Sequence, residues 1–583
     1  MKKLLLVHLL GIIFLSLSAQ TNITVSNPEA EEIIHGNYDP SLYVPEIIIN
    51  NPDSILNGVI NRVESDTMIA WLSHIDSYYN RNSGSDTVSD VRGIGAVRRW
   101  IHSKLVEISS SNENRLIVSY LDFDRNICGA PHHKNVFGIL PGLDTTNKEI
   151  VLLEGHYDTR CEDACDTSCY TPGMDDNGSG TVLVMELARV MSKYAFNQTI
   201  IFSLNTAEDQ GLYGATAFAK YMQTNEILIR ACLNNDVVGG IACGNTSSPP
   251  SCPYMDHIDS LNVRVFSHSL SNDTARISPS KQLARYLRMH QEELINPLQD
   301  TPLDINLMIR EDRLGRGGDH KPFRQKGYAA IRYTSKNEHG DGSGTPPDRQ
   351  HTTTDILGLD LTIPPDGIID SFFVDPGYLR RNTISNGVNA GFLALAPPSP
   401  QPVFTPISEG IEIEMVGADT VYQNYRVAVR SKGSGTLYFD TIYNFIGTTS
   451  FQLTGLQEDK EYYFSVMNVS NGFESLPSEE FTQVIVGIGH IPDYYMINML
   501  QNYPNPATGK TNITIWADQN IASKNAEVVI KDLSGREIQR IAVKIIGGKN
   551  NITYNITPKH KGIFTYSLLI DKQIVQTRKM VVL

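Results

Sequence analysis

The residues of this sequence that could do chemistry are histidines and acids that follow short apolar segments. Imidazole and carboxylate groups are common zinc ligands, and one further carboxylate can move a proton during hydrolysis. Five candidate ligands and one candidate base lie between positions 156 and 351, each in a segment that is typical of a strand end. The set predicts a hydrolase with two metal ions. Its members are His156, Asp175, Glu208, Asp209, Asp236 and His351.

His156 follows the apolar segment that begins at Glu149 and ends at Gly155. A metal-bound imidazole usually donates its other N–H to a second group, which fixes the tautomer of the ring. Asp158, two residues further on, is the natural partner. A single His-x-Asp motif also fits a structural histidine, so this segment predicts a ligand only together with the others.

Asp175 follows Gly173 and precedes an apolar segment that is typical of a helix. One carboxylate can bridge two cations about 3.5–4 Å apart, and nearby glycines allow the tight backbone that such a bridge needs. An ordinary helix-capping turn accounts for the same residues equally well.

Glu208 and Asp209 follow the apolar segment 200–204. Adjacent residues at a strand end point in different directions, so one can bind metal while the other acts on water. Because glutamate reaches further, we expect Asp209 to be the ligand and Glu208 the general base. Asp319 and His320 form another polar turn that we expect to support the site or face the substrate, with an ordinary loop as the alternative.

The composition is that of a globular chain of several domains. It has 583 residues, 41% of them apolar and 19% charged. The net charge of −15 argues against nucleic acid or an anionic membrane as a partner, although solubility alone accounts for it as well. Two lysines precede an apolar run over residues 4–17, which predicts a signal peptide over 1–19. No later stretch reaches about 18 apolar residues, so we expect an exported mature protein without a membrane span.

Export makes disulfides the expected state of the seven cysteines. Cys243 and Cys252 are the first expected pair. Four cysteines, which could pair in any of three ways, supply two further bridges, and a thiolate metal site in the 161–169 loop is the alternative. They are Cys128, Cys161, Cys165 and Cys169. Cys232 lies in an apolar run and is expected to be buried and unpaired.

Residues 54–397 alternate between strand and helix patterns, after an N-terminal extension or linker over 20–53. Short apolar runs at 149–153, 199–204, 230–233 and 329–333 predict strands, and 92–108, 182–194 and 280–294 predict helices. This pattern predicts an α/β fold, a three-layer sandwich around a mostly parallel mixed sheet. Sites in such sheets form at the carboxyl ends of the strands.

A proline-rich segment at 397–402 ends this domain, and two small all-β sandwich domains are expected beyond it. The first, 398–487, has predicted strands at 411–416, 425–430, 436–438 and 462–466. Its Gly455-Leu456 followed by Tyr462 resembles the tyrosine-corner end of a fibronectin type III domain. The second, 498–583, begins with Asn502-Tyr503-Pro504-Asn505-Pro506 and resembles the sorting domain of the type IX secretion system, whose machinery is then an expected partner.

The motifs of the larger domain resemble one family of enzymes. They are His156-Tyr-Asp158, Gly173-Met-Asp175-Asp176, Ala207-Glu208-Asp209, Asp236 and His351-Thr. From about position 61 to 396 the chain is similar to the zinc exopeptidases (clan MH), which include bacterial leucyl aminopeptidases, glutamate carboxypeptidases and glutaminyl cyclases.

The resemblance implies a secreted aminopeptidase that acts on peptides with two zinc ions. Asp175 would bridge them, His156 and Asp236 would complete one, and Asp209 and His351 the other. Glu208 would deprotonate the attacking water, and the Asp175–Asp176 peptide could be cis. Asp209 departs from the commoner glutamate at its position, which puts the occupancy of its zinc in doubt. A single-zinc glutaminyl cyclase, a carboxypeptidase and a non-catalytic binding protein are the alternatives.

Overall fold

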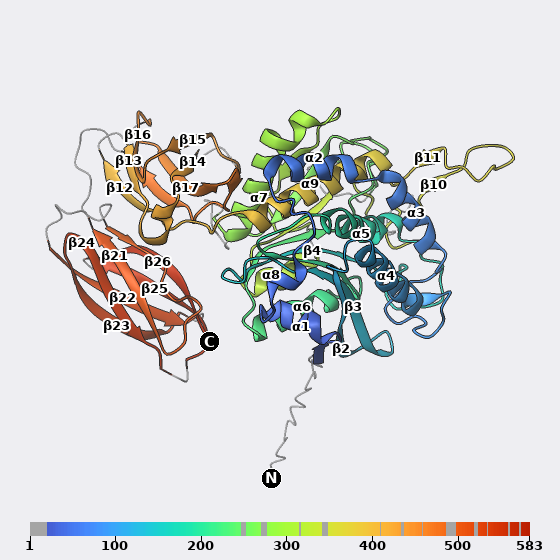
Figure 1. The fold of residues 1–583 in the computed structure, drawn as a ribbon, viewed down its shortest axis with the longest axis horizontal. Coiled ribbons are helices and arrows are strands. Elements are labelled where there is room, and N and C mark those ends of the chain that lie inside the picture. The colour runs from blue at the N-terminus through green and yellow to red at the C-terminus, as the bar shows by residue number, and fades with distance from the viewer. Residues whose placement is uncertain are drawn as a thin grey trace, which may run out of the picture. The chain divides into compact units, whose positions relative to one another are not determined.

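The computed structural model describes most of the chain after the predicted signal peptide, which lies outside the described residues (Figure 1). The described residues are 20–245, 252–269, 277–313, 316–340, 348–407, 410–432, 437–457, 459–485, 497–517, 523–532, 535–557, 560–570 and 573–583.

A mixed sheet of nine described strands is the centre of the larger domain. Its order is β1-β2-β3-β5-β4-β6-β9-β7-β8. The strands are β1 (Thr21–Val25), β2 (Ile117–Ile127), β3 (Ala130–Leu140), β4 (Ile150–His156), β5 (Thr199–Asn205), β6 (Ile229–Asn235), β7 (Asn262–Ser267), β8 (Asp304–Leu307) and β9 (Ala330–Ser335). β4 pairs in parallel with β5 and β6, and β6 pairs in parallel with β9. The pairs β1–β2, β2–β3 and β3–β5 are antiparallel.

Helices cover both faces of this sheet. In Figure 1, α4 and α5 lie on one side of it and α1, α6 and α8 on the other. The helices are α1 (Pro28–His35), α2 (Pro52–Arg62), α3 (Ser65–Asp76), α4 (Gly93–Ser110), α5 (Gly180–Met191), α6 (Tyr213–Thr224), α7 (Pro279–His290), α8 (His320–Gln325) and α9 (Pro376–Leu395). The predicted α/β sandwich is therefore confirmed.

The central strands are apolar on both faces because helices cover both. Every residue of β4, β5 and β6 is buried, as expected for parallel strands in the middle of a layered fold. In the register of the sheet His156 lies opposite Asn205 of β5, and Glu154 lies opposite Asn234 of β6. The three strands therefore end at the same edge, and the segments that follow them are brought together.

Part of the predicted N-terminal extension or linker belongs to the larger domain. β1 pairs antiparallel with β2 at the edge of the sheet. In α1, Ala30, Ile33 and Ile34 are buried in the apolar core beside the sheet. A five-residue edge strand and an eight-residue helix are too short to give a periodic signal in the sequence, which is why this segment resembles a linker.

Residues 403–485 form a small β-sandwich. Its sheets are β12-β13-β16 and β15-β14-β17-β18, with β19 on β17. The strands are β12 (Val403–Ile407), β13 (Gly410–Glu414), β14 (Asn424–Ser431), β15 (Thr441–Ile446), β16 (Ser450–Thr454), β17 (Glu461–Ser470), β18 (Phe473–Glu474) and β19 (Phe481–Val484). The hydroxyl of Tyr462 accepts a hydrogen bond from the Gln457 amide at 3.2 Å. The likeness to fibronectin type III stays a prediction.

One predicted strand of this sandwich is wrong. Leu437 and Tyr438 lie outside any strand, and Thr436 lies outside the described residues. The strand that pairs with β14 here is β15, at 441–446, whose residues are mostly exposed. An exposed edge strand has little apolar alternation, so the short apolar pair before it was the stronger signal in the sequence.

The described residues from position 497 onward form a second sandwich. Its sheets are β20-β21-β24 and β23-β22-β25-β26. The strands are β20 (Ile497–Met499), β21 (Lys510–Ala517), β22 (Lys524–Asp532), β23 (Glu537–Ile545), β24 (Gly548–Asn555), β25 (Gly562–Ile570) and β26 (Gln573–Val582). Its apolar core is made of residues 497–582 alone. Among the described helices, none combines the length and the apolar character needed to cross a bilayer.

Candidate metal centre

Glycines at two contact points let β4, β6 and the turn before α5 approach closely. A Cβ added at Gly180 would lie 2.2 Å from the carbonyl oxygen of Asn235, and one at Gly155 would lie 3.0 Å from the backbone of Gly180. The first distance is shorter than real Cβ contacts show, and the second is tighter than most, so a side chain at either position requires its neighbours to move. The close approach brings His156, Asp176 and Asp236 to one point.

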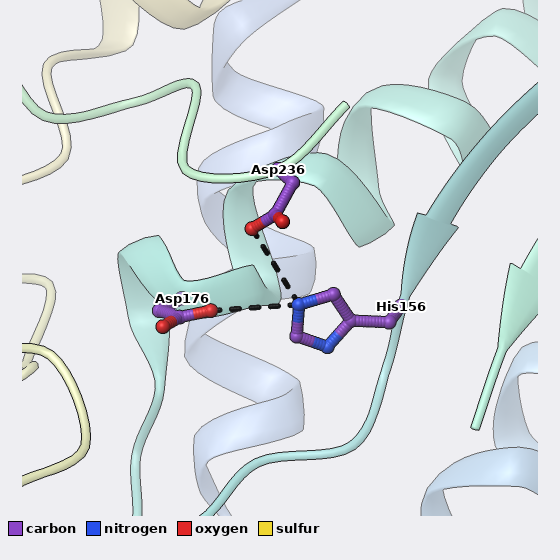
Figure 2. Close-up of side chains that lie close together, drawn as sticks. All are labelled: His156, Asp176 and Asp236. Carbon is purple, nitrogen blue, oxygen red and sulfur yellow. Dashed lines mark ion pairs between the residues drawn. The ribbon is translucent and has the colours of Figure 1, made fainter. Parts of the chain in front are cut away.

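These three side chains form the first of two clusters (Figure 2). Nε2 of His156 lies 3.5 Å from Oδ1 of Asp176 and 3.6 Å from Oδ1 of Asp236. All three residues are buried, and Nε2 of His156 makes no hydrogen bond. Because a buried polar atom is normally hydrogen-bonded, a nitrogen without a partner that faces two carboxylates fits a cation ligand.

The second cluster uses the other oxygen of the same aspartate. Nε2 of His351 lies 3.1 Å from Oδ2 of Asp176 and 3.1 Å from Oδ1 of Asp209. Asp176 thus faces the first cluster with one oxygen and the second with the other. This is the geometry expected of a carboxylate that bridges two cations.

The structure places Asp176, and not the predicted Asp175, between the two clusters. Asp175 points away from both histidines, and its Oδ1 accepts the amide N–H groups of Gly239 and Gly240 at 2.9 and 3.0 Å. The predicted cis peptide is displaced in the same way, because the cis bond joins Asp176 to Asn177 and not Asp175 to Asp176.

Asp355 accounts for which of the two aspartates points inward. Its Oδ1 accepts the amide N–H of Asp175 at 3.1 Å, and its Oδ2 accepts that of Asp176 at 3.0 Å. Its carboxyl is buried, and burial raises its pKa to about 8, with Asp175 adding to the effect. By holding two successive amides, Asp355 fixes the direction of the turn that carries Asp176.

Asp158 supports His156, as predicted from the His-x-Asp motif, and also holds the next loop. The Nδ1 atom of His156 lies 3.2 Å from the carbonyl oxygen of Asp158 and 3.6 Å from its carboxylate. That carboxylate accepts the amide N–H of Glu208 at 3.2 Å and that of Asp209 at 3.3 Å. It therefore links β4 to the loop that follows β5.

Glu208 lies beside the first cluster. Its Oε2 is 4.0 Å from Nε2 of His156, and its side chain is 11% exposed. Burial raises the pKa of this carboxyl well above its usual value; the charge of His156 opposes the shift, while Asp236 adds to it. A glutamate that takes up a proton readily suits a general base.

The site concentrates negative charge in a buried space. Burial raises the pKa of Asp209, and the neighbouring Asp176 adds to the shift. For Asp176 burial acts the same way, but the adjacent imidazoles of His156 and His351 outweigh it and lower its pKa well below the usual value. Carboxylates so crowded are stabilised by cations, and two imidazoles with carboxylate oxygens are ligands that zinc accepts. The donor set therefore fits a pair of metal ions.

Two parts of the chain match known families. Residues 135–358 match peptidase family M28, and residues 501–583 match the secretion system C-terminal sorting domain. The chain contains a peptidase family M28 domain. All the cluster residues named above lie between positions 135 and 358.

Curated proteins that are similar to the M28 domain include probable zinc metalloproteases. A probable zinc metalloprotease of Pyrenophora teres f. teres is 29% identical over 321 residues, which are 52% of this chain and 63% of that protein. One of Pyricularia oryzae is 28% identical over 379 residues, 62% of this chain and 70% of that protein. The chain thus spans about three fifths of the length of the first of these relatives.

Solved structures with likeness to the chain are more distant in sequence. An aminopeptidase of Legionella pneumophila has 19% identity and a TM-score of 0.42 over 60% of this chain and 77% of its own. A glutaminyl cyclase of Porphyromonas gingivalis has 15% identity and a TM-score of 0.37 over 57% of this chain and 98% of its own.

The M28 domain also uses a buried arginine that the sequence analysis missed. Nη2 of Arg332 lies 3.1 Å from Oδ2 of Asp236, and Nη1 lies 3.1 Å from Oδ1 of Asp312. Arg332 thereby leaves only one oxygen of Asp236 to face His156. The available signal was a single charged residue within the apolar run of β9, which is unusual for a buried strand.

Asp319 and His320, predicted to support the site or face the substrate, lie within the M28 domain. Both side chains are fully buried. Asp319 accepts a hydrogen bond from Nδ2 of Asn205 at 2.9 Å, and that amide also donates to Glu154 at 3.1 Å. Burial and this contact fit the supporting role, which stays a prediction beside the ordinary loop.

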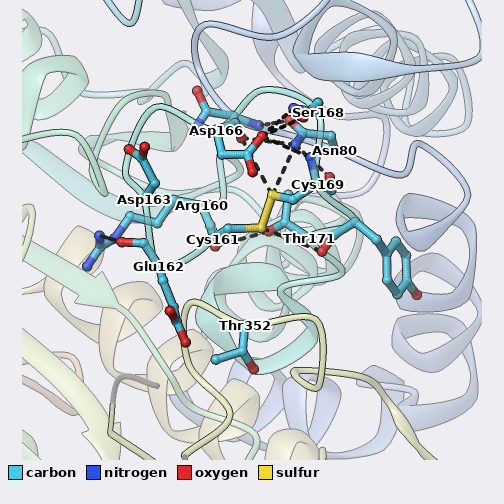
Figure 3. The surroundings of a disulfide bond; sticks show 12 residues. Asn80, Arg160, Cys161, Glu162, Asp163, Asp166, Ser168, Cys169, Thr171 and Thr352 are labelled. Atoms are coloured by element: carbon cyan, nitrogen blue, oxygen red, sulfur yellow. Dashed lines mark hydrogen bonds between the residues drawn. A yellow bond between two sulfur atoms is a disulfide. The ribbon is translucent and has the colours of Figure 1, made fainter. Parts of the chain in front are cut away.

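The predicted disulfides of the M28 domain are confirmed, and the open connectivity is resolved. The bridges are Cys128–Cys165, Cys161–Cys169 and Cys243–Cys252, and Cys232 is buried and unpaired. Figure 3 shows the Cys161–Cys169 bridge with Arg160 directly before it. Because every cysteine of the 161–169 loop is in a disulfide, the thiolate metal site is excluded there.

Proposed function

We propose that the chain is an exported zinc-dependent aminopeptidase whose two metal positions share Asp176. The observation that carries the proposal is the pair of histidine and carboxylate clusters around that one residue, with Glu208 beside them. The names of the curated relatives, probable zinc metalloproteases, support the choice of zinc.

Each side chain then has a defined task. His156 and Asp236 would hold one ion, Asp209 and His351 would hold the other, and Asp176 would be shared between them. Arg332 orients Asp236, while Asp158 orients His156 and fixes the loop that carries Glu208. Zinc held by these residues would supply a Lewis acid for the scissile carbonyl and would make the attacking water more acidic.

Glu208 moves the proton in this proposal. Its carboxylate accepts a proton from the attacking water as the oxygen bonds to the scissile carbonyl carbon. The same carboxyl then donates that proton to the leaving amine when the carbon–nitrogen bond breaks. Burial raises its pKa, which favours proton uptake by a group that must first accept a proton and then donate it.

Two related activities are distinguished by experiment. A glutaminyl cyclase needs one zinc. His156 and Asp236 would serve only one of two metal positions, so their presence beside the second cluster favours the peptidase. We expect the purified chain to release p-nitroaniline from aminoacyl p-nitroanilides. A zinc chelator should abolish this release, and added zinc should restore it.

The outcomes of this assay separate the candidates. Ammonia release from N-terminal glutamine peptides without cleavage of aminoacyl anilides identifies a cyclase. Removal of residues from the C-terminus of an N-blocked peptide identifies a carboxypeptidase. Hydrolysis that persists at full rate after metal removal contradicts the metal mechanism.

The C-terminal sorting domain supports a reaction outside the cell. We propose that the signal peptide over 1–19 directs the chain across the inner membrane and that type IX machinery then reads residues 498–583. The substrates would be peptides in the surroundings of the cell, on its surface or in the medium.

A further inference from the structure

Arg160 makes an unusual contact with one residue of the second cluster. Its Nη2 lies 2.8 Å from Nδ1 of His351, and its Nε lies 3.8 Å from Oδ1 of Asp209. Its Nη1 also donates to the carbonyl oxygen of Glu162 at 3.3 Å. The guanidinium therefore lies directly beside the position that Asp209 and His351 would give to a metal ion.

The polarity of the contact is incompatible with a metal on His351. The Nε2 atom of His351 faces Asp176 and Asp209, so it is the nitrogen that would bind the ion. A neutral ring that binds metal through Nε2 carries its proton on Nδ1 and must donate it to an acceptor. Arginine has five donors and no acceptor. The contact with Arg160 and a metal on Nε2 therefore exclude each other.

The side chain of Arg160 must move while its backbone stays in place. Cys161, the next residue, is joined to Cys169, and Thr171 donates a hydrogen bond to the Arg160 carbonyl at 3.2 Å. Asn80 also holds the carbonyl of Cys169 at 2.8 Å. The Arg160 side chain extends away from this bridge and is 21% exposed, so it has access to solvent (Figure 3).

We propose that Arg160 determines specificity by binding a carboxylate of the substrate. This inference rests on the proposed peptidase function. When the second metal binds, the guanidinium leaves His351 and remains near the mouth of the site, within the field of Asp209. There it presents its planar pair of donors, which match a carboxylate in two parallel hydrogen bonds. The carboxylate is either the C-terminus of a dipeptide or the side chain of an acidic N-terminal residue.

The first test measures metal binding and needs no catalysis. The full chain, freed of metal, is titrated with zinc against a chromophoric chelator as wild type, Arg160→Met and Arg160→Lys. Because methionine removes a cation that competes for the second position, Arg160→Met should bind the weaker zinc at least about tenfold more tightly. The tighter zinc should change little. Lysine keeps the positive charge but lacks the planar pair of donors. The affinity of Arg160→Lys for the weaker zinc should therefore stay within about threefold of wild type.

The second test measures substrate preference. Leu-Gly is compared with Leu-Gly-amide, and Glu-p-nitroanilide with Gln-p-nitroanilide, so that the two pairs separate a C-terminal carboxylate from an acidic side chain. Wild type should favour the carboxylate member of one pair by about tenfold in kcat/KM. A preference of this size is expected when one charged pair of hydrogen bonds is gained. With zinc in excess for every variant, Arg160→Met should lose that preference through KM, so that both members of the pair are used alike.

The outcomes separate this inference from the proposed function. Unchanged affinity for the weaker zinc in Arg160→Met overturns the displacement of Arg160. Equal use of both members of each pair by wild type overturns its role in specificity, although the peptidase function then stands. Failure to cleave any of the four substrates contradicts the peptidase function, while the zinc titration still decides whether Arg160 and metal compete.

Discussion

Asp175 and Asp176 are adjacent acids with opposite surroundings. Asp176 lies between two imidazoles, whose proximity lowers its pKa against the effect of burial, whereas burial raises the pKa of Asp175 to about 7. The carboxylate of Asp175 accepts backbone amides and faces neither imidazole of the two clusters. Only Asp176 is placed to share its charge between two metal ions.

This difference predicts the effect of removing either charge. Asp176→Asn should reduce the zinc content to less than one ion per chain, because both clusters lose a shared ligand. Asp175→Asn is the matched control and should keep the zinc content of wild type. Elemental analysis of dialysed protein measures both. If Asp175→Asn lost zinc while Asp176→Asn kept the zinc content of wild type, Asp175 would be the shared ligand, as the sequence predicted.

The sequence predicted most of the site residues but could not resolve this pair. His156, Asp209, Asp236 and His351 each follow a recognisable strand or motif, so their placement could be inferred one by one. In the turn Gly173–Ser179 no periodicity distinguishes neighbouring residues. The choice is made by Asp355, which is distant in sequence and holds both amides. Arg332 and Arg160 were missed for a similar reason, since their partners come from other segments.

At the scale of elements, the site depends on how closely β6 approaches the start of α5. Gly180 is the first residue of α5 and lies against the carbonyl oxygen of Asn235 at the end of β6. The strands of the sheet were predictable from their apolar runs, because each is buried on both faces. The close approach was not predictable, because glycine is also a favoured residue at helix starts where no strand packs against it.

We therefore expect Gly180→Ala to disturb the metal centre. A methyl group 2.2 Å from a carbonyl oxygen must push β6 and α5 apart, at a cost of about 1–3 kcal/mol. Zinc content and melting temperature should both fall. Gly377→Ala, in the first turn of α9, meets only ordinary contacts of 3.4 Å and serves as the control. Equal behaviour of the two variants would show that the glycine contact does not hold the site together.

A buried ion-pair cluster supports the same edge of the sheet. Glu338 is 1% exposed and pairs with Arg264 at 2.6 Å and with Arg313. Burial alone would raise its pKa, but the guanidinium groups of Arg313 and Arg264 outweigh burial and lower the pKa to about 2. A lowered carboxyl pKa stabilises the fold above the unfolded value of 4.5, and this stability is lost as the pH falls toward 2.

Glu338→Gln should accordingly lower stability in a pH-dependent way. Near pH 7 it removes the buried carboxylate charge that both guanidinium groups face, which costs about 3–5 kcal/mol. The difference in melting temperature from wild type should be constant above about pH 5 and shrink below about pH 4.5. Thermal unfolding in chelator, from pH 3 to 8, measures it without interference from metal. Glu107→Gln, whose carboxylate is 65% exposed, should change little at any pH. A difference that grows toward low pH would rule out the ion-pair origin.

At the scale of the whole molecule, the residues of the candidate metal centre and the sorting domain lie in different parts of the chain. The clustered acids and histidines lie within the M28 domain, whereas the sorting domain has a core made of its own residues alone. The disulfides that hold the metal-site loops suit an extracellular setting.

Deletion of residues 498–583 should therefore leave the peptidase activity in place and prevent export. A sandwich with its own core folds independently, so the shortened enzyme should keep kcat/KM for an aminoacyl p-nitroanilide within about twofold. In its host the shortened enzyme should accumulate inside the cell envelope, whereas full-length Glu208→Gln, which is the matched inactive control, should still be exported. Fractionation and immunoblotting measure this. Export of the shortened chain would contradict the sorting role.

The most direct test of the central claim compares turnover and metal content in Glu208→Gln. The amide keeps the size of the side chain but cannot accept the proton of the attacking water. If the clusters around Asp176 hold the zinc and Glu208 moves the proton, kcat should fall at least about 100-fold, the usual contribution of a general base, while the zinc content stays that of wild type. Near wild-type turnover in Glu208→Gln, with zinc retained, would contradict the account.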